Sequence, residues 1–187
     1  MKYSALFLLF ALSTSVGKEL TKKDFQKALN ENSEIWIGVR NYTKTDEHNQ
    51  EHKCVYVTKT SLKGDNYKFV HHYKHGNKEE NTPLNGVLSE GVGNGPVLTV
   101  SREQGNGKIN YTLKYWDDAD RCGILTFPWV DGERCELHLS RDVLPKSEQE
   151  YASGFKCGEK YNEICTGSKH PVYRLDCLSK ILDVSAH

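Results

Sequence analysis

Apolar and polar residues alternate in short segments through most of the chain between residues 34 and 140. Alternation with a period of two is typical of β-strands that bury one face. Clusters of Gly, Asn and Asp separate the segments, and the dipeptides Asn106-Gly107 and Asp131-Gly132 suit tight hairpins. The predicted strands span residues 34–43, 53–60, 66–75, 83–89, 96–102, 108–116, 122–129 and 133–140.

The order of these segments predicts the fold class. The eight strands follow one another with short connections and no helical pattern between them. This order favours an all-β fold, an eight-stranded antiparallel up-and-down barrel. A sandwich of two sheets is the alternative that the pattern leaves open. A barrel of eight strands is either filled by its side chains or holds one small ligand.

A short helix is predicted in front of the strands, over residues 21–30. Thr21 can cap it, and Asp24 follows three positions later, close to the capping-box pattern. A second helical region follows the strands over residues 147–167, with Gly154 as an interruption. Its apolar face is expected to pack on the barrel wall. The residues of that face are Cys157, Tyr161, Ile164 and Cys165.

The N-terminus has the pattern of a secretory signal peptide. Lys2 precedes the apolar run ALFLLFAL, and STSVG supplies small residues for cleavage. The run is too short to span a bilayer as a mature helix. We therefore expect residues 1–17 to be a signal peptide that is removed after Gly17, and residues 18–187 to form a single secreted domain.

Charge and cysteine content narrow the function classes. Lys and Arg number 25, as do Asp and Glu, so no strong field favours nucleic acid or an anionic membrane as a partner. Six cysteines in a secreted chain predict three disulfides. A zinc site would need close cysteine pairs such as CxxC, and the sequence contains none. Two NYT sequons predict glycosylation at Asn41 and Asn110.

The sequons also predict which side chains enter the barrel. A glycosylated asparagine faces solvent, so its neighbours on the same strand face inwards. The third strand has no sequon, and its more apolar face is expected to point inwards. The inward residues are then Trp36, Gly38, Arg40 and Tyr42 on the first strand, Tyr67, Phe69, His71 and Tyr73 on the third, and Ile109, Tyr111, Leu113 and Tyr115 on the sixth.

The cysteines give a second test of direction. Cys122 and Cys135 can reach the cysteines of the following helical region only if they point out of the barrel. Glu136 and His138 then point inwards on the last strand. An interior with a carboxylate, an arginine, two histidines and aromatic rings suggests water and a polar ligand, because an unpaired buried charge is costly.

Four motifs give the chain a family resemblance, namely DADRCGILTF, ERCELHLS, KCGEKYNEIC and VYRLDC. With the order of signal peptide, helix, eight strands and helix, they resemble the tick salivary lipocalins of the histamine-binding family. The resemblance covers nearly the whole mature chain and is most specific in its last third. It implies three disulfides, which are Cys54–Cys177, Cys122–Cys157 and Cys135–Cys165.

The resemblance also implies a function. Such proteins trap host mediators of inflammation, among them histamine, serotonin, leukotrienes and other fatty-acid derivatives, and some bind host proteins. Glu136 matches a glutamate that contacts histamine, Tyr42 matches a tyrosine near the end of the first strand, and Tyr111 falls where an aromatic ring lies. His138 and Gly123 replace a tryptophan and an acid of the histamine binders, and Thr45 and His48 stand where another acid and tryptophan are expected.

These matches lead to a set of candidate ligand-binding residues and three functional hypotheses. The candidates are Glu136, Tyr42, Tyr111, His138, Arg40, Trp36, Phe69 and Tyr73. A biogenic amine is the first expected ligand, because a cation prefers a carboxylate and an aromatic face. An anionic lipid mediator facing Arg40 is the alternative, and an antagonist of a host protein of complement or coagulation is the third.

No catalytic pattern competes with these hypotheses. The sequence contains no nucleophile elbow, no HExxH and no Gly-rich phosphate loop. His71 and His75 share a strand face but lie too far apart for easy chelation, so no metal and no cofactor is expected. The sequence therefore predicts a monomeric, non-enzymatic carrier of a small molecule.

Overall fold

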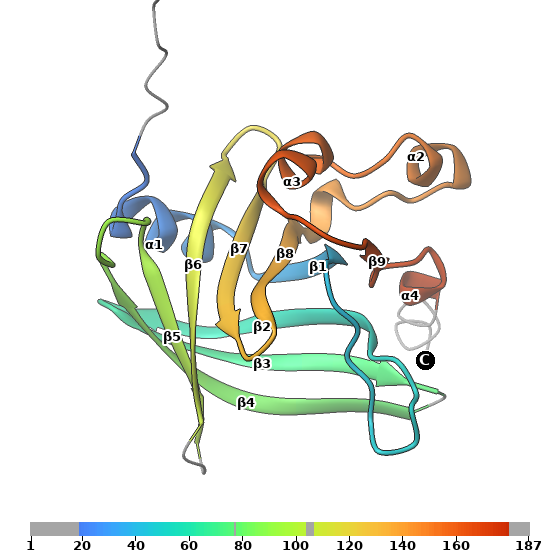
Figure 1. Ribbon diagram of the computed structural model, residues 1–187, viewed down its shortest axis with the longest axis horizontal. Coiled ribbons are helices and arrows are strands. Elements are labelled where there is room, and N and C mark those ends of the chain that lie inside the picture. Colours follow the sequence, from blue (N-terminus) through green and yellow to red (C-terminus); the bar gives the residue numbers. More distant parts are fainter. Residues whose placement is uncertain (1–18, 77, 104–106, 180–187) are drawn as a thin grey trace, which may run out of the picture.

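The structure is a computed structural model that describes residues 19–76, 78–103 and 107–179, and a single antiparallel sheet lies at its centre (Figure 1). Neighbouring strands pair in sequence from β2 to β8, and β1 pairs with both β2 and β8. The sheet therefore closes, which confirms the predicted barrel and excludes the sandwich. The strands are β1 (Glu34–Arg40), β2 (Lys53–Lys63), β3 (Asn66–His75), β4 (Lys78–Ser89), β5 (Val97–Arg102), β6 (Lys108–Asp117), β7 (Cys122–Trp129) and β8 (Gly132–Ser140).

Helix α1 (Lys22–Glu31) closes one end of the barrel. The predicted cap is confirmed, because the Thr21 side chain accepts from the Asp24 N–H and the Thr21 N–H donates to Asp24. Phe25, Ala28 and Leu29 are its buried residues. They lie against the barrel interior, so α1 forms the floor of the barrel. The predicted signal peptide, residues 1–17, lies outside the described residues.

The chain after β8 runs along the outside of the barrel (Figure 1). The predicted interruption of the second helical region at Gly154 is confirmed, because Gly154 adopts a positive φ of 92° and this part of the chain forms only short elements. These elements are η1 (Arg141–Val143), α2 (Glu148–Ala152), α3 (Gly158–Ile164), β9 (His170–Pro171), which pairs with β1, and α4 (Asp176–Ser179). Within the described part of the chain, no helix is long and apolar enough to cross a membrane.

Three disulfides fasten this outer segment to the barrel wall. Cys54 on β2 bonds to Cys177, Cys122 on β7 bonds to Cys157, and Cys135 on β8 bonds to Cys165. They are the pairs that the family resemblance implies. The outward residues of β8, among them Leu137 and Leu139, are buried beneath this segment with Tyr161 and Tyr173.

Register shifts interrupt the alternation of side chains in β1, β2 and β6, and those in β1 and β6 affect the predicted inward residues. The register of β1 shifts between Ile37 and Val39, and that of β6 shifts between Leu113 and Tyr115. A bulge adds one residue and so reverses which face the following side chains occupy. The inward residues of β1 are therefore Ile35 and Ile37 before the bulge and Arg40 after it.

Three inward predictions are wrong for this reason. Trp36 points out of the barrel and is fully buried beside Tyr56 and Tyr173, with ring centroids 4.4 and 5.5 Å away. Gly38 also faces outwards, where a Cβ would lie 2.7 Å from Leu139 Cδ1. Tyr115 packs against the same outer cluster, and Trp116 takes its place beside the interior.

Candidate ligand-binding site

The barrel encloses a cavity that opens at the end opposite α1. The space between its lining residues, including open solvent, is about 920 Å³. The floor and most of the wall are apolar, with side chains from α1 and from strands β1 to β7. The apolar and aromatic lining consists of Phe25, Ala28, Leu29, Ile35, Ile37, Tyr42, Val55, Val57, Tyr67, Phe69, Leu84, Leu98, Val100, Tyr111, Leu113, Trp116 and Leu125.

Six polar side chains complete the lining. They are Arg40, Lys44, His52, His71, Glu136 and His138. Arg40, Glu136 and His138 come from the paired strands β1 and β8, where Arg40 and Glu136 are register partners. Of the remaining three, Lys44 and His52 come from the β1–β2 loop and His71 comes from β3. The polar groups therefore gather toward one side of an otherwise apolar cavity.

Glu136 is the single carboxylate among the described residues of this lining, and it already has partners. The Tyr42 hydroxyl donates a hydrogen bond to its Oε1, and His138 Nε2 lies 2.9 Å from its Oε2. Burial raises the pKa of this carboxyl, but the hydrogen bond and charge of His138, the bond from Tyr42 and the charge of Arg40 together hold it below its usual value. Glu136 is therefore a buried, hydrogen-bonded anion.

The two cations of the lining are less well matched. Arg40 is 4% exposed, and its guanidinium donates to the His52 carbonyl at 2.9 Å. Its buried Nε has no hydrogen-bond partner among the described residues. Burial lowers the pKa of Lys44, Glu136 raises it, and the charges of Arg40 and Arg102 lower it further. Both cations would be stabilised by an added negative charge.

Two histidines of the wall, His52 and His71, are not charged near neutral pH. Burial, together with the charge of Lys44, lowers the pKa of His71 to about 4 and that of His52 to about 4. Both rings therefore lose their protons well below neutral pH. These rings serve as neutral donors or acceptors on the cavity wall.

Tyr42 lies at the centre of an aromatic and cationic group at the mouth. Its ring meets Phe127 edge-on at 5.8 Å, and Phe127 lies 4.7 Å from the Tyr111 ring. The guanidinium carbons of Arg40 and Arg134 lie 5.1 and 4.6 Å from the Tyr42 ring centroid. These contacts hold the Tyr42 hydroxyl toward Glu136.

Six of the eight candidate binding residues line this cavity and two do not. The six are Glu136, Tyr42, Tyr111, His138, Arg40 and Phe69. Trp36 is excluded by the β1 bulge. Tyr73 does not line the cavity, but its ring stacks on that of His52, which does, with ring centroids 4.2 Å apart. Sequence reasoning missed Lys44 and His52, because both lie outside the predicted strands and alternation therefore assigns them no direction.

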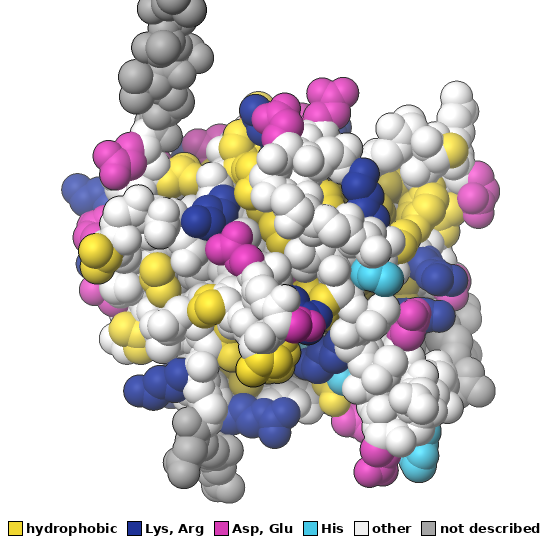
Figure 2. Space-filling view, in the orientation of Figure 1, with side chains coloured by type: hydrophobic (Ala, Val, Ile, Leu, Met, Phe, Trp, Pro, Cys, Tyr) yellow, Lys and Arg dark blue, Asp and Glu magenta, His cyan; other side chains and the backbone are white. Residues whose placement is uncertain are grey.

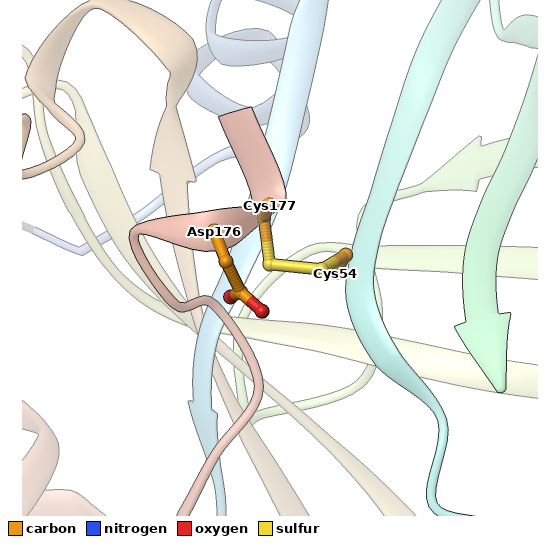
Figure 3. A group of neighbouring side chains, drawn as sticks. All are labelled: Cys54, Asp176 and Cys177. Carbon is orange, nitrogen blue, oxygen red and sulfur yellow. A yellow bond between two sulfur atoms is a disulfide. The ribbon is translucent and has the colours of Figure 1, made fainter. Parts of the chain in front are cut away.

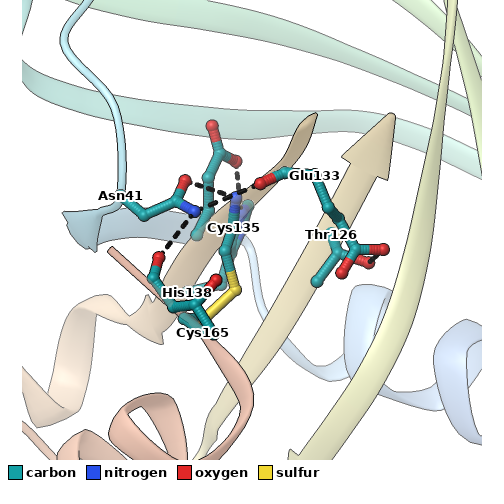
Figure 4. Close-up of a disulfide and its surroundings, with 8 residues drawn as sticks. Asn41, Thr126, Glu133, Cys135, His138 and Cys165 are labelled. Carbon is teal, nitrogen blue, oxygen red and sulfur yellow. Dashed lines mark hydrogen bonds and ion pairs between the residues drawn. A yellow bond between two sulfur atoms is a disulfide. The ribbon is translucent and has the colours of Figure 1, made fainter. Parts of the chain in front are cut away.

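Asn41, a predicted glycosylation site, is engaged in the fold (Figure 4). Its Nδ2 donates to the carbonyls of Glu133 and Thr166 at 3.2 and 3.1 Å, and its Oδ1 accepts from the Cys135 N–H at 2.9 Å. The amide thereby joins the end of β1 to β8 and to the segment after Cys165. In contrast, the other sequon residue, Asn110, is exposed on β6.

A group of possible metal ligands lies elsewhere, outside the cavity (Figure 3). Within the described ranges, Cys54, Asp176 and Cys177 are the one such group that the geometry gathers. The two sulfur atoms are joined in a disulfide and offer no thiolate, so the group lacks the chemistry of a metal site. The histidines of β3 are also dispersed, since His71 lines the cavity and His72 contacts Thr58 on the outer face.

A closed eight-stranded barrel with one capped end and an internal cavity defines a ligand-binding lipocalin. Comparison with known proteins agrees with this class. The model of the tick histamine-binding protein family matches residues 17–179, and the chain belongs to that family. No curated protein matches the sequence.

Two solved structures resemble this chain at low sequence identity. Japanin from Rhipicephalus appendiculatus, solved with bound cholesterol, is 13% identical, with a TM-score of 0.51 over 75% of this chain and 91% of that chain. Lobster apocrustacyanin A1 is also 13% identical, with a TM-score of 0.48 over 83% of this chain and 88% of that chain. The likeness to Japanin supports the fold assignment.

Proposed function

We propose that this protein is a secreted carrier that sequesters a small host mediator, and that the mediator has a largely apolar body and an anionic head group. A carboxylated fatty-acid derivative, of which a leukotriene is one type, is the class that fits best. The observation that carries the proposal is the imbalance of charge in the cavity. Its carboxylate has hydrogen-bond partners, whereas among the described residues its cations have no carboxylate oxygen within 4.0 Å.

The imbalance follows from the contacts of each charge. Among the residues that the structure describes, no carboxylate oxygen lies within 4.0 Å of Arg40 or Lys44, whereas both oxygens of Glu136 are hydrogen-bonded. With His52 and His71 neutral, Arg40 and Lys44 outnumber Glu136. A cationic ligand would meet like charges in this lining, and an anion would meet two partners.

The rest of the cavity supports the same ligand class. The aliphatic and aromatic wall extends from the mouth to α1, so an apolar body can leave water as it enters. In Figure 2, Lys and Arg side chains gather at the lower rim of the molecule on both sides of the β5–β6 turn, where Arg102 and Lys108 are exposed. Positive charge near the mouth favours the approach of an anion.

A biogenic amine such as histamine or serotonin is the second candidate. It is favoured by the closeness of Tyr42, Tyr111 and Glu136, since two aromatic rings beside a carboxylate suit an ammonium group. Binding there would require the amine to replace His138 or Tyr42 as a partner of Glu136. The two candidates therefore predict opposite roles for the cavity charges.

Calorimetric titration of the refolded mature protein distinguishes the candidates. We expect arachidonate to bind, and Arg40→Met to weaken it by roughly 10- to 100-fold, the value of a charge-assisted hydrogen bond. Arg141→Met, which removes a cation paired with Glu34 on the outer wall, is the matched control and should leave affinity unchanged.

Histamine and serotonin should bind weakly, with Glu136→Gln having little effect on arachidonate. Tight amine binding that Glu136→Gln abolishes would support the second candidate and contradict the first. If cholesterol binds as well as arachidonate, the anionic head group is not recognised. Binding of none of these compounds would favour an antagonist of a host protein.

A further inference from the structure

His75 joins the β1–β2 loop to the hairpin of β3 and β4 at the cavity mouth. It is the last residue of β3, and its Nδ1 lies 2.7 Å from Asp46 Oδ2 in the loop. Its Nε2 lies 2.9 Å from Glu80 Oε1 on β4. The side chain is only 11% exposed. Three separate elements therefore meet at one imidazole ring.

The geometry indicates the protonation state of this ring. A neutral imidazole has one donor nitrogen and one acceptor nitrogen, whereas an ionised carboxylate only accepts. Both nitrogens of His75 face carboxylate oxygens. In a neutral ring, the unprotonated nitrogen would face one of these oxygens, so two acceptors would meet with no hydrogen between them. The imidazolium ion donates on both sides. The bond to Glu80 raises the pKa of His75, burial lowers it, and the bond to Asp46 raises it, with a net upward shift.

Asp46 transmits this contact to the whole loop. Its Oδ1 accepts from the backbone N–H groups of His48 and Gln50 at 2.9 and 2.8 Å. Its own N–H donates to the Gln50 carbonyl at 3.0 Å, and a β-bridge joins Thr45 to Glu51. The loop is thus a compact turn built around one carboxylate, whose other oxygen is held by His75.

The same loop carries groups of the ligand cavity. Lys44 lines the mouth, and its carbonyl accepts from the His52 N–H at 2.8 Å. The His52 ring stacks on Tyr73, whose hydroxyl donates to Glu80 Oε2 at 3.0 Å. A shift of the loop would therefore move part of the cavity wall.

The titratable groups around His75 keep their protonation states near neutral pH, so the proton of His75 itself is the one that changes. The backbone N–H of Gln50 lowers the pKa of Asp46, and the bond from His75 lowers that of Glu80, so both stay ionised. His52 has a pKa of about 4 and is neutral, and burial raises the pKa of Tyr73. On β4, Lys78 acts on Glu80, and Lys74 of β3 is paired with Glu79 of β4 at 2.9 Å.

We propose that protonated His75 fastens the β1–β2 loop across the cavity mouth, so that a bound ligand leaves faster when His75 loses its proton. His75 is thus a positioning residue that acts through Asp46. Because the raised pKa belongs to the fastened state, the contact is complete below the usual pKa of histidine. It is lost as pH rises through the raised value. The effect on the ligand rests on the proposed function, whereas the effect on the loop does not.

The loop is tested first, without ligand, by amide hydrogen exchange. Protection factors, which correct for the intrinsic pH dependence of exchange, are measured for the His48 and Gln50 amides at pH 5.5 and 8.5. We expect them to fall by roughly fivefold or more, the lower end of couplings between sites. His75→Gln should give low protection at both pH values, and His48→Gln, an exposed histidine of the same loop, should keep the wild-type profile at Gln50.

The cavity is tested next by stopped-flow release of arachidonate over the same pH range. The wild-type dissociation rate should rise with pH, and that of His75→Gln should be high and independent of pH. Failure of arachidonate to bind would refute the proposed ligand class, while the exchange data would still decide on the loop. Protection factors that do not change with pH in the wild type would overturn the proposal. If His75→Gln does not fold, Glu80→Gln should shift the His75 titration, followed by NMR, to lower pH.

Discussion

Replacement of Asn41 is expected to destabilise the barrel even when no glycan is present. Asn41→Ala removes two donated hydrogen bonds and one accepted bond. It leaves the Cys135 N–H and the carbonyls of Glu133 and Thr166 without these partners. A net hydrogen bond contributes about 0.5–1.5 kcal/mol, which gives roughly 1.5–4.5 kcal/mol for three. Because Asn41 is only half-buried and water can replace part of the loss, we expect about 2 kcal/mol.

Two further variants separate the amide from the sequon. Asn41→Asp keeps the shape but places a carboxylate oxygen against two carbonyl oxygens, so it should be at least as destabilising as Asn41→Ala. Thr43→Ala abolishes the sequon at an exposed position and leaves the amide in place, so its effect should lie within about 0.5 kcal/mol of zero.

Urea denaturation of the refolded, unglycosylated proteins, with disulfides intact, provides the assay. Tryptophan fluorescence follows unfolding, and the free energy is extrapolated to water. Equal stability of wild type and Asn41→Ala would refute the structural role of the amide. So would a Thr43→Ala variant as unstable as Asn41→Ala, because the effect would then belong to the sequon region rather than to the amide.

Three more predictions concern glycosylation, the outward Trp36 and one disulfide. In protein secreted from eukaryotic cells, peptide mass spectrometry should find a glycan at Asn110 and none at Asn41, whose Nδ2 has both donors engaged; full occupancy of Asn41 would contradict its role in the fold. Trp36→Ala should cost roughly 3–5 kcal/mol in urea denaturation but leave arachidonate affinity unchanged, since Trp36 lies outside the cavity; a large loss of affinity would contradict that placement. Replacement of Cys54 and Cys177 by Ala should cost about 2–5 kcal/mol, and unchanged stability would show that the bridge adds nothing.

The sequence was sufficient to predict the barrel and the direction of its last strand. Period-two alternation and hairpin dipeptides are local signals, and they identified eight strands in the right order. Outward Cys135 fixed the opposite direction for Glu136 and His138, and both line the cavity. That inference held because β8 pairs with β7 without a register shift.

The candidate site was less predictable where alternation is interrupted. Strict alternation back from an outward Asn41 places Trp36 in the interior. The bulge between Ile37 and Val39 adds one residue, so Trp36 points outwards instead. A bulge depends on pairing with the neighbouring strand, so one strand's sequence does not reveal it. Lys44 reaches the cavity from a loop whose path is set by Asp46 and His75, which are distant in sequence.

The head-group preference of the cavity is tested most directly by comparing arachidonate with its methyl ester in one calorimetric experiment. The two ligands share the apolar body and differ in the charge that Arg40 and Lys44 would meet. We expect the acid to bind at least roughly tenfold more tightly than the ester, the value of one charge-assisted hydrogen bond. Equal affinities, or histamine binding more tightly than arachidonate, would contradict it.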